Sequence, residues 1–467
     1  MNAIGDNFLA EYTEGSLVLS FSGAVFLFLF LPVALLGYYV LPPKFRNRWL
    51  LFTSLLFYTL GDVSNLPLLL LVAVLQYTAA IFLEKHPKFR RFWLILAIVV
   101  NLWLLFYYKY ASFFLSVFGV SVASPALPIG ISFYTFQAIS YTVDVYRGEV
   151  RAERKFTVFL TYLTLFPQLV AGPIVRYCEV DRALTGRRFT LSQCSRGAFL
   201  FSVGLFKKLA LADSLATLSG AFSEGSPTAL LAWLSAIAFT LQIYFDFSGY
   251  SDMARGLGRL FGFEFPENFR YPYIASSIGE FWRRWHITLS SFFKSYVYIP
   301  LGGNRRGKAR TALNLLVVWL LTGLWHGAAY TFLVWGLLYG LLLVFEKLTN
   351  FRLPVGLGNL YTLFFVVVGF VFFAADSLSS AFSQLAAMLA PSVWADGAAA
   401  RLLSDHALLL AVSAVFATPL PAYLMRKLMK TPERLALSRA ALTPILLVLS
   451  FSFLVGASAH PFLYFRF

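Results

Sequence analysis

Long apolar runs recur along this chain, and short loops rich in lysine and arginine separate them. A helix needs about 20 apolar residues to cross the hydrocarbon core of a bilayer, so such runs predict membrane-spanning helices. The runs are continuously apolar rather than alternating, which argues against a transmembrane barrel. The pattern therefore predicts an all-α polytopic membrane protein. Its expected spans lie near residues 25–41, 49–60, 68–83, 92–108, 198–218, 229–247, 357–374, 406–424 and 441–457.

Two more apolar stretches do not fit a single crossing. Residues 156–175 contain two prolines and a glycine between basic loops, which predicts a re-entrant hairpin, because broken backbone at membrane depth must lie against protein or a water-filled cavity. Residues 311–348 begin after a basic loop and end near Lys347, so both ends favour the same side and predict a helical hairpin. With a further stretch that returns inward by Tyr146, we expect about nine to twelve membrane elements.

Composition supports the membrane class. Of the 467 residues, 59% are hydrophobic and only 13% are charged, outside the usual range of soluble globular proteins. The formal net charge of +16 would suggest a nucleic-acid partner in a soluble protein. Here most lysines and arginines lie in short loops between the spans, as the positive-inside rule expects, so we predict no nucleic-acid binding.

The charged loops also predict the orientation of the chain. The N-terminal tail carries Asp6, Glu11 and Glu14 and no lysine or arginine. The basic loops at residues 42–48 and 84–91 are expected in the cytoplasm, which places the N-terminus outside. The basic residues between 426 and 439 are expected inside as well, so the C-terminus, which follows one more span, falls outside. The first span lacks the flanking pattern of a cleavable signal peptide and is expected to be retained.

Cys178 and Cys194 lie in a basic loop that we place in the cytoplasm. A disulfide is not expected in that compartment. Their spacing is not that of a metal site, so we predict no bound metal.

His326 is the main candidate for chemistry. It stands in the sequence GLWHGAA, within the stretch predicted to form a hairpin. Ionisable side chains inside a membrane are costly and mark function by default, and a neutral imidazole can act as a general base. The alternative is a structural histidine hydrogen-bonded between helices. Small residues around it permit close helix approach, and we assign the preceding Trp325 a structural role.

His286, Asp246 and Asp252 are further candidates. His286 lies among arginines and tryptophans, so it is either a second catalytic or donor-orienting group or an interfacial histidine in an aromatic belt. Asp246 follows a long apolar run, and we expect it to pair with an arginine such as Arg255 or to cap a helix starting near Ser248. A structural or tunnel-shaping role is favoured over catalysis for both aspartates.

A basic cluster lies in the segment 255–310, which we interpret as interfacial helices and loops on the cytoplasmic face. Its side chains could bind the phosphates of a nucleotide-like donor such as coenzyme A. The alternative is ordinary loop charge or contact with anionic lipid. The stretch GGNRRGKA resembles a phosphate loop, but Ala309 stands where serine or threonine is required, which argues against an NTPase. The tentative donor-binding residues are Arg283, Arg284, Lys294, Arg305, Arg306 and Lys308.

Several sequence blocks occur in a fixed order, and together they carry a family resemblance. They are VFLFLFLP near Val25, ISFYTFQAISYTVDVYRG, FPQLVAGPIVRY, LQIYFDFSGYSDMARGLGRLFGFEFPENF, EFWRRWHITLSSFFKSYVYIPLGGNRRG and LTGLWHGAAYTFLVWGLLYG. With these blocks the chain resembles the membrane-bound O-acyltransferase (MBOAT) family, in the branch of alginate O-acetylation, D-alanyl transfer and peptidoglycan O-acetylation proteins. The resemblance covers residues 20–467. It implies one integral-membrane domain over 1–467, helices around a central tunnel, and a catalytic region at 255–350.

The resemblance also implies a reaction. Members of this branch pass an acyl group from a cytoplasmic thioester, here acetyl-CoA, to an extracytoplasmic acceptor. His326 corresponds to the family's catalytic histidine, and His286 to a second position often implicated. The implied acceptor is alginate or a similar exopolysaccharide, reached through a periplasmic SGNH-type or AlgJ/AlgX-like acetyltransferase, and the implied location is the bacterial inner membrane.

The C-terminal sequence FLYFRF resembles an aromatic motif of this branch. Tyr464 would then be a shuttle that carries the acyl group; the alternative is an aromatic-belt anchor with Arg466 snorkelling to the interface.

Three function classes stay open at this point. Peptidoglycan O-acetylation uses the same chemistry, whereas a transporter or a scaffold of a polysaccharide secretion complex would perform no covalent step.

Overall fold

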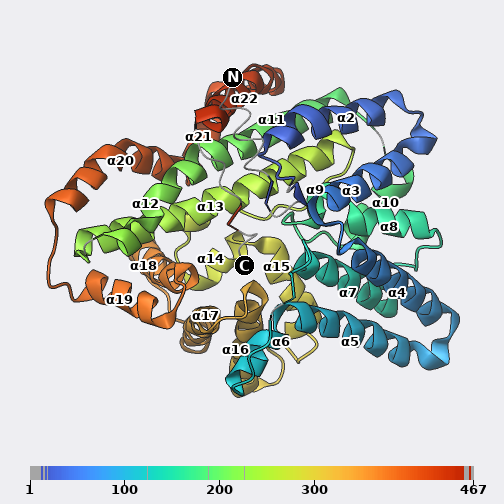
Figure 1. Ribbon diagram of the computed structural model, residues 1–467, viewed down its shortest axis with the longest axis horizontal. Coiled ribbons are helices and arrows are strands. Elements are labelled where there is room, and N and C mark those ends of the chain that lie inside the picture. Colours follow the sequence, from blue (N-terminus) through green and yellow to red (C-terminus); the bar gives the residue numbers. More distant parts are fainter. Residues whose placement is uncertain are drawn as a thin grey trace. The chain divides into compact units, whose positions relative to one another are not determined.

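Figure 1 shows the computed structural model, which describes residues 19–123, 125–187, 189–225, 227–456 and 462–463 and the backbone of residues 12–13 and 16–17. Helices make up nearly all of the secondary structure in these ranges. The exceptions are the two-residue strands β1 (Tyr12–Thr13) and β2 (Ser16–Leu17), which pair antiparallel. The predicted all-α fold class is confirmed.

Seven helices within the described ranges are long and apolar enough to cross a membrane, judged by length and composition. Two shorter apolar helices accompany them, at Phe26–Val40 and Leu378–Leu389. The seven long ones are Leu66–Lys85, Pro87–Lys109, Ala229–Leu260, Tyr330–Thr349, Val355–Ala374, Gly397–Phe416 and Pro432–Val455. These helices agree with the polytopic membrane protein expected from the apolar runs.

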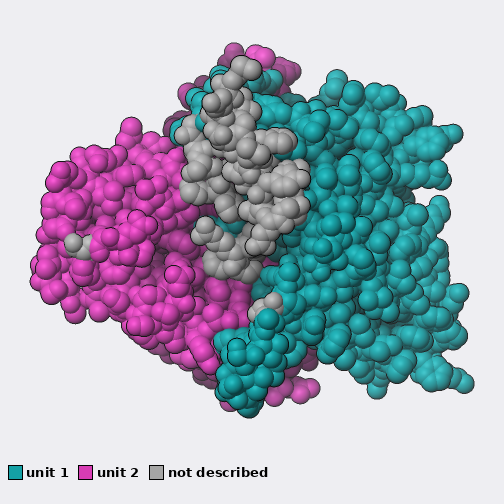
Figure 2. All heavy atoms as spheres, viewed as in Figure 1, with its two compact units in different colours: residues 1–205, 250–267, 439–465 teal, residues 206–249, 268–438, 466–467 magenta. Residues whose placement is uncertain are grey.

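The chain contacts divide the protein into two compact units, drawn in teal and magenta in Figure 2. Unit 1 consists of residues 1–205, 250–267 and 439–465, and unit 2 of residues 206–249, 268–438 and 466–467. One boundary falls inside the helix Ala229–Leu260. The single domain over residues 1–467 stays a prediction.

Unit 1 holds most of the N-terminal helices. Gly130 and Gly148 flank α7 with left-handed φ angles of 74° and 78°, and a Cβ at Gly130 would lie 2.6 Å from the Leu169 carbonyl oxygen. Glycine at position 130 therefore allows α7 to begin directly against the neighbouring backbone. The helices are the π-helical turn η1 (Phe26–Phe30), α2 (Leu31–Val40), the 3₁₀ turn η2 (Pro43–Phe45), α3 (Arg46–Asp62), α4 (Leu66–Lys85), the 3₁₀ turn η3 (Pro87–Phe89), α5 (Arg90–Lys109), α6 (Ala111–Val117), α7 (Ile131–Arg147), α8 (Phe156–Thr164), α9 (Phe166–Leu169), α10 (Tyr177–Gly186) and α11 (Leu191–Phe206), which ends at the boundary.

The segment predicted to be re-entrant is a broken helix. α8 ends at Thr164, and Leu165 leaves the helical conformation before the single turn of α9. The Gln168 amide donates to the Tyr162 carbonyl at 2.6 Å, and the Tyr162 hydroxyl donates to the Val175 carbonyl at 2.9 Å. These buried bonds satisfy polar groups that the break releases, as a non-helical segment at membrane depth requires. The break is confirmed, and re-entry from one side of the membrane stays a prediction.

Unit 2 contains the hairpin that carries His326. α16 and α17 are the two arms, so the predicted helical hairpin is confirmed. A Cβ at Gly336 would lie 2.5 Å from the Trp319 carbonyl oxygen, so only glycine lets the two helix backbones approach this closely. The elements are η4 (Lys207–Ala212, π-helical), α12 (Asp213–Glu224), α13 (Ala229–Leu260, up to Gly249), η5 (Pro272–Ile274), α14 (Ile278–Arg284), α15 (Ile287–Phe293), η6 (Lys294–Tyr298, π-helical), α16 (Gly307–His326), α17 (Tyr330–Thr349), α18 (Val355–Ala374), α19 (Leu378–Leu389), α20 (Gly397–Phe416), α21 (Leu420–Leu428) and α22 (Pro432–Gly456, from Arg439 in unit 1).

Two predicted boundaries need correction. α13 continues through Asp246 and Ser248 to Leu260, so the idea that Asp246 caps a new helix near Ser248 is wrong. The predicted span at residues 406–424 is shifted, because α20 begins at Gly397 and ends at Phe416, before Pro419. Asp396 starts α20 by accepting a hydrogen bond from the Ala399 amide at 2.7 Å. Local capping and proline thus decided ends that hydropathy alone misplaced.

Candidate functional site

His326 is the last residue of α16 and lies in an aromatic box. The imidazole centroid lies 5.0 Å from Phe373, 5.1 Å from Trp335 and 5.0 Å from its neighbour Trp325, each near edge-on. The side chain is buried. The box comes from three helices, because Trp335 belongs to α17 and Phe373 to α18. These rings surround the imidazole with protein on three sides.

Gly327, the residue after His326, stands where a side chain would not fit. A Cβ at this position would lie 2.5 Å from Cδ2 of the Phe332 ring, closer than real contacts allow. Gly327 is extended, with φ −175°, so α16 stops directly after the histidine. The WHG sequence therefore places an imidazole at a helix end with an aromatic ring closing the turn behind it.

His286 is the second buried histidine of unit 2, and its backbone is unusual. It has φ 43° and ψ 54°, a left-handed conformation that is unfavourable for a residue with a side chain. Nδ1 of His286 lies 3.1 Å from Oδ1 of Asn268, which also accepts from the Thr288 amide at 3.2 Å and the Thr288 hydroxyl at 3.0 Å. Asn268 is fully buried, and its backbone carbonyl accepts from the Ile287 amide at 3.0 Å. Strained backbone held this firmly is typical of functional positions.

Asn268 was not among the sequence candidates. The signal that could have found it is its place in PENF, a buried asparagine at the end of a sequence block and ahead of the two short helices. As an acceptor for Nδ1–H, Asn268 Oδ1 would fix the tautomer that leaves Nε2 as the basic nitrogen. Burial lowers the pKa of the His286 imidazole to about 3, so this ring is neutral at physiological pH.

Trp325 brings the two predicted histidines into one cluster. Its indole centroid lies 5.0 Å from His326 and 5.7 Å from His286. Phe247 of α13 closes the other side of His286, with an edge contact at 4.7 Å. Trp325 thus contacts two imidazoles rather than one, and the structural role assigned to it from the sequence stays a prediction.

A cavity of about 690 Å³ opens beside this cluster. Its buried lining includes His286, Trp282, Trp319 and Thr322, and Thr322 lies one turn before His326 on α16. The His326 ring itself is not among the lining side chains. The cavity thus reaches His286 directly and approaches His326 along the same helix face. A volume of this size is typical of small-molecule sites.

The exposed part of the cavity is basic. Arg283 and Lys294, both in the predicted donor-binding cluster, line it. Lys347, in the last turn of α17, and Arg352 line it as well and were not among the predicted donor-binding residues. The other cluster members, Arg305, Arg306 and Lys308, are exposed and lie outside the lining.

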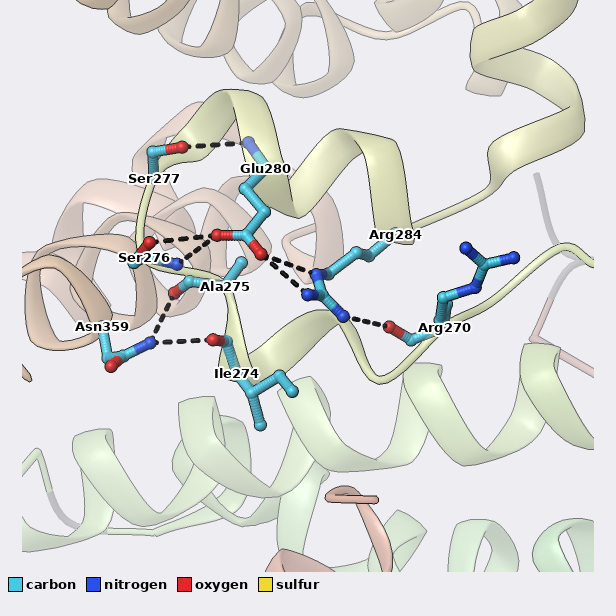
Figure 3. A network of polar contacts seen from close by, with 8 residues as sticks. All are labelled: Arg270, Ile274, Ala275, Ser276, Ser277, Glu280, Arg284 and Asn359. Carbon is cyan, nitrogen blue, oxygen red and sulfur yellow. Dashed lines mark hydrogen bonds and ion pairs between the residues drawn. The ribbon is translucent and has the colours of Figure 1, made fainter. Parts of the chain in front are cut away.

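Two glutamates of the cavity lining, Glu346 and Glu280, accept hydrogen bonds from neighbouring parts of the protein. Glu346 accepts from the Ile278 amide at 2.7 Å and the Gly279 amide at 2.9 Å, which joins α17 to the start of α14. Glu280 accepts from the Ser276 amide and hydroxyl, each at 3.0 Å, and pairs with Arg284 at 2.8 Å (Figure 3). Burial alone would raise the pKa of Glu280, but these hydrogen bonds outweigh it and lower that pKa.

Arg284 is therefore engaged within the protein rather than directed into the cavity. Its guanidinium holds Glu280 and donates to the Arg270 carbonyl at 3.2 Å (Figure 3). This network keeps α14 in place beside the cavity. Among the described residues, the predicted donor contacts are thus best represented by Arg283 and Lys294.

Asp246 has a partner that the sequence did not suggest. Lys208 Nζ lies 2.8 Å from Asp246 Oδ1 and 2.7 Å from Asp213 Oδ1, and all three side chains are buried. The expected pairing of Asp246 with Arg255 is wrong; Arg255 instead lies 3.4 Å from Asp252 within unit 1. Lys208 belongs to the π-helical segment η4, and π-helical turns of this kind occur often at functional sites.

The remaining predictions concern Tyr464, a bound metal and the two cysteines. Tyr464 lies outside the described residues. Within those residues, no group of three or more metal-ligating side chains was found, and Cys178 and Cys194 are both free thiols. The catalytic, donor-binding and structural roles assigned from the sequence stay predictions.

Comparison with known proteins places these features in a family. A family described as "MBOAT, membrane-bound O-acyltransferase family" matches residues 49–383, which include both histidines and the cavity. A probable alginate O-acetylase AlgI of Azotobacter vinelandii is 43% identical over 392 residues, covering 80% of this chain and 79% of that protein. The peptidoglycan O-acetyltransferase of Helicobacter pylori is 38% identical over 421 residues, covering 80% of each. A teichoic acid D-alanyltransferase of Bacillus subtilis is 27% identical over 273 residues, 53% of this chain and 68% of that protein.

Proposed function

Because the chain belongs to the membrane-bound O-acyltransferase family, we propose that it transfers an acetyl group from cytoplasmic acetyl-CoA to a hydroxyl of an extracytoplasmic polysaccharide. The family makes it a multi-pass membrane enzyme that transfers acyl groups to oxygen. Relatives described as alginate O-acetylases support acetyl as the group moved and an alginate-like polymer as the acceptor.

One observation carries the proposal. The cavity combines an exposed basic lining with a buried inner part next to His286 and one helical turn from His326. Arginine and lysine side chains suit the phosphates of coenzyme A, and the apolar interior suits its thioester end. A donor that bound in this way would present its carbonyl to the histidine cluster while its charged part stayed at the exposed end.

The reaction then needs only a base and the exclusion of water. His326 would accept the proton of an acceptor hydroxyl while that oxygen attacks the thioester carbonyl. The carbon–sulfur bond breaks, the thiolate leaves, and the proton held by His326 passes to it, so the products are the ester and the free thiol. The aromatic box around His326 would keep water out and so suppress hydrolysis of the thioester.

The cellular setting is part of the same proposal. The resemblance to this family implies a bacterial inner-membrane protein, and the basic loops favour an orientation with both termini outside and the donor end in the cytoplasm. A periplasmic SGNH-type or AlgJ/AlgX-like acetyltransferase would take the acetyl group onward to the polymer. Peptidoglycan is the second candidate acceptor, because the Helicobacter pylori relative covers as much of this chain as the alginate O-acetylases do.

Purified full-length protein in proteoliposomes tests the function. With acetyl-CoA labelled in the acetyl group, a hydroxyl-bearing oligosaccharide and the periplasmic acetyltransferase, we expect labelled ester and free coenzyme A in equal amounts. Oligomers of uronic acid and of peptidoglycan, compared side by side, distinguish the two acceptors. A transporter or scaffold would leave the thioester intact, and that result would reject the enzymatic proposal.

Tyr464 gives a separate prediction within this function. If its phenol carries the acetyl group between His326 and the outer partner, mass spectrometry of the C-terminal peptide under turnover will show one acetyl adduct. Tyr464→Phe keeps the ring but removes the accepting oxygen, so transfer to the polymer is expected to fall at least about tenfold. Full activity of Tyr464→Phe without any adduct in the wild type would leave Tyr464 an interfacial anchor.

A further inference from the structure

Trp282 forms the wall of the cavity at its buried end, and we propose that this side chain limits the length of the acyl group that the enzyme accepts. The inference rests on the proposed function, because it treats the cavity as the thioester site. Trp282 lines the cavity and is only 7% exposed. It lies on α14, next to Arg283 in the sequence, and its ring lies 5.5 Å from Trp335 of the aromatic box.

The wall is a cluster of aromatic rings in edge-to-face contact rather than a single ring. The Trp282 centroid lies 4.4 Å from Trp319, 4.9 Å from Tyr339 and 5.5 Å from Trp335. Trp335 in turn meets the His326 ring at 5.1 Å. A chain that extended past the thioester carbonyl near Thr322 would therefore run into aromatic rings within a few bond lengths.

The wall is held rigidly from the backbone side. Glu346 accepts the Ile278 and Gly279 amides at 2.7 and 2.9 Å, and the Ser277 hydroxyl caps α14 through the Glu280 amide at 3.0 Å. The Trp282 carbonyl accepts from the Ser290 hydroxyl at 3.3 Å. Close-packed rings on an anchored helix cannot move aside cheaply, so an extra methylene meets steric repulsion instead of empty space.

Trp282 also carries a polar atom that suits this place. Its indole N–H is buried, and no acceptor among the described residues lies within hydrogen-bonding distance of it. An indole N–H can only donate a hydrogen bond, and burying it in a protein without an acceptor is energetically unfavourable. A carbonyl oxygen of a bound donor would supply the acceptor, so the same side chain would both stop the acyl group and orient its thioester.

The size of the effect follows from the selectivity of hydrophobic pockets. One methylene that fits or fails to fit changes kcat/KM by about 10- to 200-fold. Replacing the indole by a smaller side chain removes the obstruction and leaves room beside Trp319. We therefore expect Trp282→Leu and Trp282→Ala to accept butanoyl and hexanoyl thioesters that the wild type rejects.

The experiment compares acetyl-, butanoyl- and hexanoyl-CoA with the full chain in proteoliposomes. The ratio of kcat/KM for butanoyl-CoA to that for acetyl-CoA is expected to rise at least about tenfold in Trp282→Leu, and further in Trp282→Ala. Trp233→Leu is the matched control. This tryptophan of α13 is also in unit 2, donates to the Met388 carbonyl at 3.1 Å and does not line the cavity, so its chain-length profile should equal that of the wild type.

If the variants lose turnover, the binding of non-reactive thioether analogues of the donor still measures which chain length the cavity accepts. S-hexyl-CoA should gain affinity relative to S-ethyl-CoA in Trp282→Leu, and Trp282→Phe provides a milder change if the others do not fold. An unchanged chain-length ratio, in turnover or in analogue binding, overturns the role of Trp282. A wild type that does not turn over acetyl-CoA at all rejects the proposed function instead, so the two failures are distinguishable.

Discussion

Replacing His326 by alanine is expected to lower acetyl transfer by about 10²- to 10⁴-fold, the range that a positioned general base contributes. The protein should stay folded, because Trp335 and Phe373, which border the imidazole, also contact each other directly at 5.4 Å. The measurement is release of coenzyme A and formation of ester by purified protein, with kcat and KM determined separately. A fall confined to kcat would match a group that acts on the reacting atoms.

His406→Ala is the matched control for His326. His406 is half-buried on α20, and its Nδ1 lies 3.0 Å from the Leu402 carbonyl oxygen of the preceding turn. Its loss should leave turnover near that of the wild type. Near-normal acetyl transfer by folded His326→Ala would reject the general-base assignment, and a structural histidine between helices would be the better interpretation.

Lys208→Met is expected to reduce the free energy of unfolding by about 3–5 kcal/mol, as removal of one partner from a buried ion pair does. Lys208 is only 1% exposed and serves two carboxylates, at 2.7 Å to Asp213 and 2.8 Å to Asp246. Without its ammonium group, two negative charges would be left close together and shielded from water. Since the whole stability of a protein is about 5–15 kcal/mol, thermal unfolding of the purified variant should shift strongly downward, or the yield of folded protein should collapse.

A combined variant separates charge from packing. Adding Asp213→Asn and Asp246→Asn to Lys208→Met removes the unbalanced carboxylates and should restore part of the lost stability. Lys207→Met is the adjacent control. Lys207 is half-buried, with its Nζ 5.9 Å from the centroid of the Tyr244 ring, so its loss should have a much smaller effect. Equal effects of the substitutions at 207 and 208 would contradict a special role of the buried triad.

Lys208 also illustrates a limit of sequence reasoning. Two adjacent lysines stand inside a run that hydropathy assigns to a membrane span, which was a visible anomaly. The sequence does not show which of the two turns inward, because the π-helical segment η4 changes the register of the helix face. The partner was equally hidden, since Asp246 lies on another helix.

The cavity lining likewise combines residues that the sequence predicted with residues that it did not. Arg283 and Lys294 were predicted from a local cluster of positive charge, and both line the cavity. Arg284 belongs to the same cluster, but Glu280 one turn away engages it. Lys347, in the last turn of α17, and Arg352, just after that helix, come to the cavity because α17 returns alongside α16.

By itself, the sequence determined the helical membrane class, the hairpin of α16 and α17, the break after α8 and the identity of the family. The class, the hairpin and the break follow from local physics, because the length of an apolar run sets a span and glycine and proline set the breaks. The family can be identified without the fold, because it is recognised from sequence blocks in a fixed order. Only the tertiary structure decided that Trp325 joins His286 to His326, that Asn268 holds His286, and that Trp282 lines the cavity. Such contacts join residues far apart in the chain, so they depend on helix rotation and register, which the hydropathy of a nearly all-apolar helix leaves undefined.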